Sequence, residues 1–409
     1  MAELGLELGA QDVDLPVGIQ LSRAAQQRAH LGRVAPRDVG AGGEERRRVV
    51  SIPGLAHADH EPGADEDREE GHQRSQHGAD DTGGGRGSVS VVIPVWNGRR
   101  WLDGCLGSIA RQSQAVHEVI AVDNGSSDGS VAHLCAAHPS VRVVALATNT
   151  GFAHAVNQGI RVATGEYVAL LNTDVELEPD WVARMTGALA ADPRAAAVAC
   201  KMVQLGAPGE IYDAGDVLRR DGACEQRGRF TRDDGSFDAA GEVFGACAGA
   251  ALYRRDAVLS TGGFDERYFA YLEDVDLALA LRLAGWRCRY EPAVAHHAGE
   301  GSSGELPGGH RRLVARNSVL LVAKWFPARW LPLVAYRQAG WLWHAARERR
   351  LGEQVRGLAA AVPMLPSVLR MRGTLRRRAV IPIEVAVPSR PIRGAGALGH
   401  PSRHAASGG

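Results

Sequence analysis

Short apolar runs alternate with segments of helical periodicity along residues 88–171. The runs of strand length are residues 89–97, 117–123, 141–147 and 166–171. The segments between them are predicted to be helices: residues 101–113, 131–137 and 153–164. Strands that alternate with helices predict an α/β fold with a mostly parallel sheet covered by helices. Pro94 is expected to end the first strand.

Carboxylates follow two of these apolar runs. Asp123 ends the run 117–123, and Asp174 follows the run 166–171. In open α/β sheets, ligands bind at the carboxyl ends of the strands, so both side chains are expected beside one crevice. An aspartate there can hold a divalent cation against a diphosphate. The alternative for Thr173 and Asp174 is a turn that only caps the following segment.

Composition excludes some classes of function. The 409 residues carry no net charge and are 45% hydrophobic, so nothing global indicates nucleic-acid binding. The six cysteines are scattered without a Cys-x-x-Cys pair, which fits a reduced, cytoplasmic protein better than a zinc or redox site. Neither a Gly-x-Gly-x-x-Gly fingerprint nor a phosphate loop with its lysine is present.

The two ends of the chain differ from the middle. Residues 1–87 are expected to be disordered, or to precede the true translation start, because residues 40–87 are dominated by Gly, Asp, Glu, Arg and His. Residues 301–378 are predicted to be a helical extension, and residues 379–409 a disordered tail.

The helical extension mixes aromatic residues with arginines. Between residues 313 and 344, no charge-free run reaches the roughly 18 residues that a spanning helix needs. Two interpretations stay open: a helix that lies on an anionic membrane surface, and a helical cap on the preceding domain. The basic cluster Arg376-Arg377-Arg378 supports the first interpretation, a helix on an anionic membrane surface.

Several motifs follow one another in residues 88–316. They are Pro94-Val95-Trp96-Asn97, Asp123-Asn124-Gly125-Ser126, Asn149-Thr150-Gly151-Phe152, Asn172-Thr173-Asp174, Gly262-Gly263-Phe264-Asp265, Glu273-Asp274-Val275-Asp276 and Ala284-Gly285-Trp286. In this order they resemble family 2 glycosyltransferases with the GT-A fold. Within the family, the pattern is most similar to bacterial rhamnosyltransferases and galactofuranosyltransferases. The resemblance implies a GT-A catalytic domain over residues 88–300.

The resemblance implies a role for each matching position. The residues that would bind the nucleotide sugar are Pro94, Asn97, Asp123, Asn149, Gly151, Asn172 and Asp174. Asp174 would also bind a divalent cation, Mn²⁺ or Mg²⁺, together with a histidine for which His297 is favoured over His296. Asn172 stands where the family usually has the first aspartate of Asp-x-Asp, so the site has one charge fewer.

Asp274 matches the family's catalytic base, and Glu273 would orient it or contact the acceptor. Upstream aromatic residues, Tyr268, Phe269 and Tyr271, would raise the pKa of these carboxylates by desolvation. The alternative is an ordinary helix start, since acidic residues in a first turn favour the helix dipole.

Two further segments are less defined. Residues 198–241 show no clear pattern and are expected to shape the acceptor side. The small residues of 244–253 are consistent either with backbone that passes close to a ligand or with a packed core strand.

The resemblance implies an inverting glycosyltransferase of cell-wall or surface-polysaccharide synthesis. The favoured donor is dTDP-rhamnose and then a UDP-sugar, and the acceptor is a hydroxyl of a glycan or a lipid-linked sugar. The protein would work in the cytoplasm, at the inner face of the cell membrane if the extension binds lipid. The alternatives are a catalytically weak sugar- or lipid-binding relative, made conceivable by Asn172, and a nucleotidyltransferase.

Overall fold

The computed structural model describes residues 49–51, 85–207, 209–299 and 309–390. The first half of its sheet is parallel, in the order β4-β3-β2-β5. Its elements are β2 (Val89–Val95), α1 (Leu102–Ala110), β3 (Glu118–Asn124), α2 (Ser130–Ala137), β4 (Arg142–Leu146), α3 (Phe152–Val162) and β5 (Tyr167–Leu171). These are the predicted strands and helices, with each boundary shifted by at most three residues.

The second half of the sheet continues from β5 in the order β12-β7-β13-β11. Strand β12 runs antiparallel to β5 and β7, whereas β7 and β13 are parallel. The elements are β6 (Val175–Leu177), α4 (Trp181–Ala191), β7 (Ala195–Gln204), β8 (Ile211–Asp213), β9 (Asp216–Leu218), β10 (Cys224–Gln226), β11 (Gly241–Val243), β12 (Ala250–Arg254), α5 (Arg255–Ser260), the 3₁₀ turn Glu266–Tyr268, α6 (Glu273–Leu283) and β13 (Arg287–His297). The α/β fold class predicted from the sequence is confirmed.

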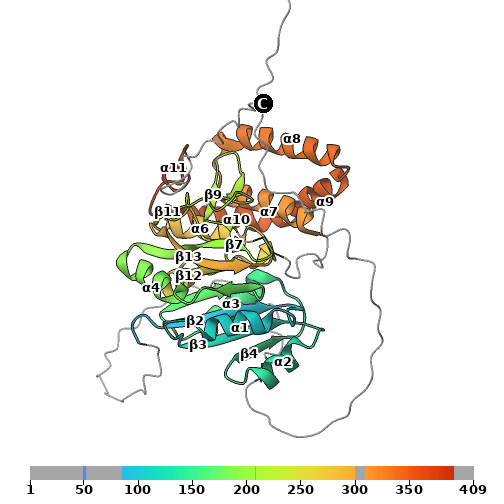
Figure 1. Ribbon diagram of the computed structural model, residues 1–409. Helices are drawn as coiled ribbons and strands as arrows, with labels where there is room; N and C mark the ends of the chain where they lie inside the picture. Colours follow the sequence, from blue (N-terminus) through green and yellow to red (C-terminus); the bar gives the residue numbers. More distant parts are fainter. Residues whose placement is uncertain (1–48, 52–84, 208, 300–308, 391–409) are drawn as a thin grey trace, which may run out of the picture.

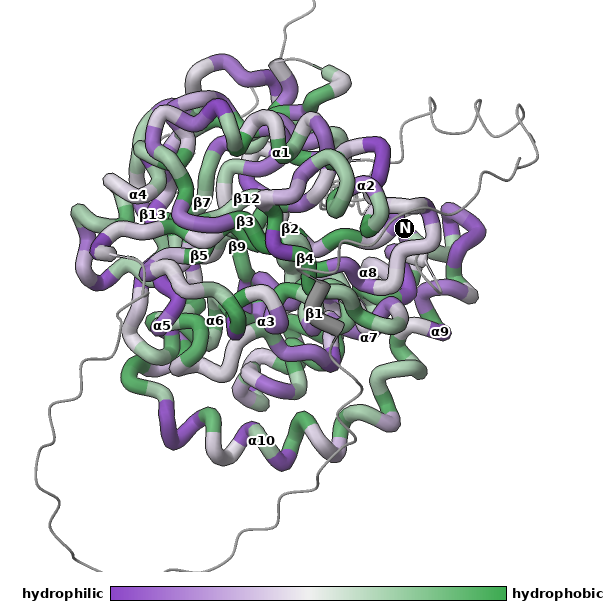
Figure 2. Tube along the Cα trace, turned by 90° about the horizontal axis from the view of Figure 1, so that it is seen from below, coloured by the Kyte–Doolittle hydropathy of each residue, from purple (hydrophilic) through white to green (hydrophobic). Residues whose placement is uncertain are grey.

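Helices of the C-terminal extension gather at the end of the sheet that is opposite β4 (Figure 1). They are α7 (Gly309–Trp325), α8 (Leu331–Arg347), α9 (Leu351–Ala361), α10 (Leu365–Arg378) and α11 (Ile383–Ala386), with 3₁₀ turns at Ala328–Trp330 and Val362–Met364. A hydrophobic cluster that includes Leu279, Leu321, Phe326 and Trp330 joins this extension to α6. Two further clusters contain the apolar side chains of the strands. In Figure 2 the green, hydrophobic stretches of the trace include parts of the central strands.

Pro94 lies inside β2 and does not end it. Its neighbour strand β3 pairs along β2 as far as Val95, but β5 pairs only as far as Val92. A proline cannot donate to a strand ladder, so it is tolerated where one neighbouring strand has already ended. In the same way β13 continues through Pro292, at the irregularity in its pairing with β7 between Tyr290 and Val294.

Two segments that were expected to be disordered contain regular structure. Residues 49–51 form a short strand, β1 (Val49–Ser51), that pairs in parallel with β4. The rest of residues 1–84 lies outside the described part of the chain. At the other end, residues 379–390 are described, and α11 packs on the extension with Ala386 and Val387 fully buried. The apolar residues between 380 and 387 gain by burial on the extension, so the predicted start of the tail at residue 379 is wrong. The tail predicted for residues 391–409 lies outside the described part of the chain.

Candidate active site

The carboxyl ends of β2 and β3 carry the first group of predicted site residues. Asp123 is buried at the end of β3, where its Oδ2 accepts a hydrogen bond from the Ser126 N–H (3.1 Å). Its Oδ1 is buried without a hydrogen-bond partner in the described part of the chain, so it is an acceptor that a ligand can use. Asn97 has a left-handed φ of 51°, and its Oδ1 accepts from the Ser127 N–H (2.9 Å). The Asn97 side chain therefore joins the exits of the two strands.

The loop after β4 contains Asn149 and Gly151. Asn149 Oδ1 accepts hydrogen bonds from the Asn124 side chain (3.0 Å) and from the Gly151 N–H (2.9 Å). Gly151 has φ 93°, and a Cβ there would lie 2.6 Å from the Phe269 ring, so only glycine fits. The hydrogen bonds of Asn149 hold this loop at the sheet edge where Asp123 lies. Asn124, which ties the loop to β3, was not singled out from the sequence.

Asp174, Asn172 and His297 come together beyond the end of β5. Asp174 Oδ1 lies 3.6 Å from His297 Nε2, and Asn172 Nδ2 lies 3.4 Å from the same nitrogen. His296 points elsewhere and bonds to Glu178 (2.7 Å). Burial lowers the pKa of His297, which keeps the imidazole neutral and able to donate a lone pair. Of the two histidines, the structure brings His297 to Asp174.

The spacing of this pair fits a shared cation. Neighbouring ligand atoms that each lie about 2.1 Å from a metal ion are about 3–3.5 Å apart, close to the observed separation of Asp174 and His297. The Nδ1 atom of His297 is buried without a hydrogen-bond partner among the described residues. The ring of Tyr212 packs on that of His297, with ring centroids 4.1 Å apart. The guanidinium group of Arg229 lies over the Tyr212 ring, 4.1 Å from its centroid.

Tyr212 and Arg229 were missed from the sequence. They come from residues 198–241, where no regular pattern is visible. The positive charge of Arg229 contributes to lowering the pKa of His297, so it lies near enough to act on an anion bound there.

Asp274 lies in the first turn of α6. Its Oδ2 accepts a hydrogen bond from the Ala248 N–H (3.2 Å), and its Oδ1 accepts from the Val275 N–H (2.8 Å). Burial raises the pKa of Asp274, and these hydrogen bonds oppose the shift. Burial and the neighbouring Asp274 raise the pKa of Glu273 well above its usual value, and Glu273 Oε2 has no hydrogen-bond partner in the part of the chain described.

Asp276, the third carboxylate of the motif, is a structural residue. Its oxygens accept hydrogen bonds from Tyr268 (3.0 Å), Lys324 (2.6 Å) and Trp325 (2.6 Å). These contacts fasten α6 to α7. Asp276 is fully engaged, so it is a poorer candidate than Asp274 for proton transfer.

Residues 248 and 249 connect the Asp274 side of the site with the His297 side. The Ala248 N–H binds Asp274, and the Gly249 carbonyl accepts from the Asn172 N–H (2.9 Å). A Cβ at Gly249 would lie 3.3 Å from Asn172 Nδ2 and 3.7 Å from His297 Nε2. The core-strand interpretation therefore holds for residues 250–254, which form the buried strand β12, while residues 248 and 249 lie beside the candidate site.

Two more buried carboxylates lie on the same side of the molecule. Burial raises the pKa of Asp213 to about 7, and burial with the charge of Asp274 raises the pKa of Asp216 well above its usual value. Each has an Oδ2 atom without a hydrogen-bond partner among the residues described. The sequence Asp213-Ala214-Gly215-Asp216 was the only local sign of these two carboxylates. Two aspartates around a glycine are also typical of an exposed turn, so the sequence did not indicate that they are buried.

Comparisons with known proteins bear on the class of this chain. Residues 90–261 match the family model of glycosyl transferase family 2. The chain is 29% identical over 317 residues to an N-acetylglucosaminyl-diphospho-decaprenol L-rhamnosyltransferase of Mycobacterium tuberculosis, which covers 71% of this chain and 94% of the relative. It is 32% identical over 215 residues to a pre-mycofactocin glycosyltransferase of the same species, covering 51% of this chain and 42% of that protein.

A solved structure, that of GalNAc-T7 with UDP, GalNAc and Mn²⁺, superposes with a TM-score of 0.49 at 15% identity, over 59% of this chain and 48% of that one. The α/β fold and the family match over residues 90–261 define the class as that of the glycosyltransferases. The chain carries a family 2 glycosyltransferase domain, which confirms the resemblance seen in its motifs.

Proposed function

We propose that this protein is an inverting glycosyltransferase that moves a sugar from a nucleotide-sugar donor to a hydroxyl group of a glycan or lipid-linked acceptor. One observation carries the proposal. The consecutive residues Ala248 and Gly249 contact Asp274 on one side and Asn172 on the other. A carboxylate with raised pKa is thereby held beside a pair of cation ligands, Asp174 and His297.

Asp274 is the general base of the proposed reaction. As the acceptor oxygen attacks the anomeric carbon, its proton moves to the Asp274 carboxylate, while the bond from that carbon to the diphosphate oxygen breaks on the opposite face. The buried side chain of Glu273, in the same turn of α6, has a carboxylate oxygen, Oε2, that can accept a further hydrogen bond. Asp123 Oδ1 accepts a hydrogen bond from the nucleotide.

Asp174 and His297 would hold the divalent cation, Mn²⁺ or Mg²⁺, with Asn172 as a neutral neighbour. When bound, the cation supplies a Lewis acid that stabilises the negative charge on the departing diphosphate. Arg229, held over Tyr212, adds a fixed positive charge from the protein on that side.

Within the class, we infer that the donor is dTDP-rhamnose in preference to a UDP-sugar, and that the pathway is cell-wall or surface-polysaccharide synthesis. The support is the rhamnosyltransferase of M. tuberculosis, whose name specifies a lipid-linked acceptor and of which this chain covers 94%.

The test is a transfer assay with a panel of nucleotide sugars and a short lipid-linked N-acetylglucosamine acceptor, with and without Mn²⁺. Acceptor-dependent release of nucleoside diphosphate supports the proposal. Release of pyrophosphate would indicate a nucleotidyltransferase instead. Binding of donor without either product would indicate a weak, sugar-binding relative.

A membrane surface is the proposed location of the acceptor. Among the described residues, no helix is long and apolar enough to cross a membrane. Helix α8 nevertheless exposes Leu333 (51%), Tyr336 (73%) and Trp343 (56%), and Arg347 lies over the Trp343 ring at 4.6 Å. Exposed aromatic residues beside arginines favour an interface with anionic lipid, on the cytoplasmic face of the cell membrane.

Vesicle sedimentation tests this location. Replacing Tyr336 and Trp343 with serine is expected to reduce binding to anionic vesicles, because each loses an aromatic side chain from the interface. Replacing Arg376, Arg377 and Arg378 with alanine is expected to reduce it in a salt-dependent way. Equal binding by the parent and both variants at low salt would contradict the proposed surface.

A further inference from the structure

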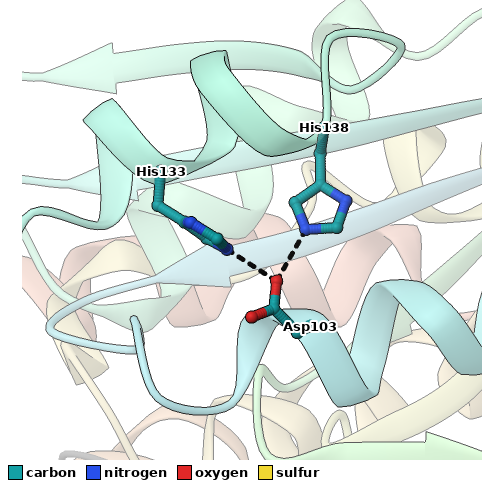
Figure 3. Close-up of side chains that lie close together, drawn as sticks. All are labelled: Asp103, His133 and His138. Carbon is teal, nitrogen blue, oxygen red and sulfur yellow. Dashed lines mark hydrogen bonds and ion pairs between the residues drawn. The ribbon is translucent and has the colours of Figure 1, made fainter.

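A second group of metal-ligand side chains lies outside the candidate active site, between α1 and α2. Asp103 is in the first turn of α1, His133 is on α2, and His138 directly follows α2 (Figure 3). Both histidines direct Nε2 at Asp103 Oδ1, at 2.6 Å for His133 and 2.9 Å for His138. In the part of the chain that the structure describes, this is the one trio of His, Cys, Asp or Glu residues whose ligand atoms all lie within 4.8 Å of one another.

We propose that Asp103, His133 and His138 form a binding site for a divalent transition-metal ion of the zinc class. Two imidazoles with one carboxylate are a ligand set typical of Zn²⁺, whereas Mg²⁺ and Ca²⁺ prefer oxygen ligands. Three protein ligands leave a fourth tetrahedral position for water. The side chains of His133 and His138 are 15% and 23% exposed, so an ion can reach them from solvent.

The backbone holds the two histidines in place. The His133 N–H donates to the Gly129 carbonyl (3.0 Å), and the His138 N–H donates to the Leu134 carbonyl (3.0 Å). The carbonyl of His138 in turn accepts from the Val141 N–H (3.0 Å). Ligands on fixed backbone lose less freedom when an ion binds than ligands on a mobile loop.

Asp103 is the most exposed of the three side chains and the one with the most freedom to move when an ion enters. Nitrogen and oxygen ligands of one tetrahedral zinc ion are about 3.3 Å apart, since each bond is about 2.0–2.1 Å long. The observed separations are shorter, as expected for hydrogen bonds. The Asp103 side chain is 60% exposed, and its Oδ2 has only a loose contact with Arg99 (3.5 Å). It can therefore withdraw by less than about 1 Å to admit the ion.

The alternative is that the trio only links α1 to α2 through two hydrogen-bonded histidines. Such a link explains one histidine on Asp103, but it does not require a second histidine to converge on the same oxygen. An ion at this point would make the same link stronger, because coordination bonds would replace the hydrogen bonds.

Calorimetric titration of the chelator-treated full-length protein with Zn²⁺ tests the proposal. The Asp174→Asn variant is the starting protein, because it weakens the candidate active-site cation site. It is expected to bind one Zn²⁺ ion, and with Co²⁺ to show the visible absorption of tetrahedral coordination. In that background, His133→Gln and His138→Gln are each expected to weaken binding at least tenfold and to abolish the Co²⁺ bands.

Two matched controls separate this site from other zinc ligands. His117→Gln changes an exposed histidine of the same domain, and Cys135→Ser removes the exposed thiol of α2. Both are expected to leave the titration unchanged, with thermal unfolding used to show that all variants are folded. Failure of the Asp174→Asn protein to bind Zn²⁺, or binding that His133→Gln and His138→Gln leave unchanged, would overturn the proposal.

Discussion

Some acidic side chains of the two halves of the sheet are used in opposite ways. In the half built from β2 to β5, carboxylates such as Asp128 accept hydrogen bonds from nearby backbone and hydroxyl groups. Burial works against the charge of Asp128, but hydrogen bonds from Ser130 and from the Arg99 N–H lower the pKa of Asp128. In the half built from β7 to β13, burial raises the pKa values of Asp213, Asp216 and Glu273, which keep unpaired oxygens.

This difference separates carboxylates that build the fold from carboxylates that are available for chemistry. A paired aspartate such as Asp128 needs no ligand to be stable. An unpaired buried carboxylate costs folding free energy until a proton, a cation or a substrate hydroxyl satisfies it. The exception in the first half, the unpaired Asp123 Oδ1, lies where the nucleotide is expected.

The largest expected effect concerns Asp274. In Asp274→Asn the side chain keeps its size but cannot take a proton, so turnover should fall by roughly 10²–10⁴-fold, the usual contribution of a general base. Donor affinity should stay within experimental error, because the role proposed for Asp274 is on the acceptor hydroxyl and not on the donor. Steady-state turnover with excess acceptor, beside calorimetric titration with nucleoside diphosphate and Mn²⁺, measures both.

Asp276→Asn is the matched control within the same motif. It removes charge from a buried group that Lys324 and Trp325 contact, so it should reduce the free energy of unfolding by about 3 kcal/mol. Turnover per folded molecule should change little. If Asp276→Asn loses turnover while Asp274→Asn keeps it, the base is assigned to the wrong carboxylate.

The next effect concerns the proposed cation ligands. Asp174→Asn and His297→Ala should each weaken Mn²⁺-dependent donor binding at least ~10-fold and should lower turnover as well. His296→Ala is the control, because His296 bonds to Glu178 and not to Asp174. Donor binding that is equally strong with and without Mn²⁺ in the parent protein would remove the basis for this site.

The pH dependence of the free energy of unfolding tests the contrast between the carboxylates of the two halves of the sheet. The pKa of Asp213 is raised from an unfolded value near 3.9 to about 7. The native state therefore binds the extra proton between these values, and Asp213 destabilises the fold increasingly as pH rises from about 4 to about 7. Asp213→Asn should thus gain stability relative to the parent across this window and keep a constant advantage above it.

Asp128→Asn should behave in the opposite way. Because hydrogen bonds lower the pKa of Asp128, its contribution is present above the unfolded pKa and is lost as pH falls. This variant should be less stable than the parent at neutral pH and equal to it in acid. Chemical denaturation at several pH values measures both variants, and parallel pH profiles would show that the contrast between the two halves is wrong.

The first half of the sheet could be predicted from the sequence because its signals are local. Each strand there is a continuous apolar run, and Asp123 and Asp174 follow such runs directly. Asp213, Tyr212 and Arg229 could not be predicted, because they lie in short strands and turns of residues 205–241, where the sequence has no periodic pattern. The Asp103, His133 and His138 trio was missed for a different reason, since its members are separated by up to 35 residues.

The smallest expected effect lies at the outer edge of the first half, where β1 pairs with β4. Deleting residues 1–48 should leave folding and activity unchanged, because the sequence predicts a disordered segment there. Deleting residues 1–84 also removes β1 and its three paired residues, Val49 to Ser51. A net contribution of about 0.5–1.5 kcal/mol for each backbone hydrogen bond predicts a small loss in the free energy of unfolding.

Turnover should survive both deletions, because three strands, β4, β3 and β2, separate β1 from β5 and Asp174. Equal melting temperatures of the two truncated proteins would show that the β1 pairing contributes nothing measurable. Loss of activity in the shorter protein alone would show that the outer edge supports the nucleotide site, and the two halves would then differ less than their carboxylates indicate.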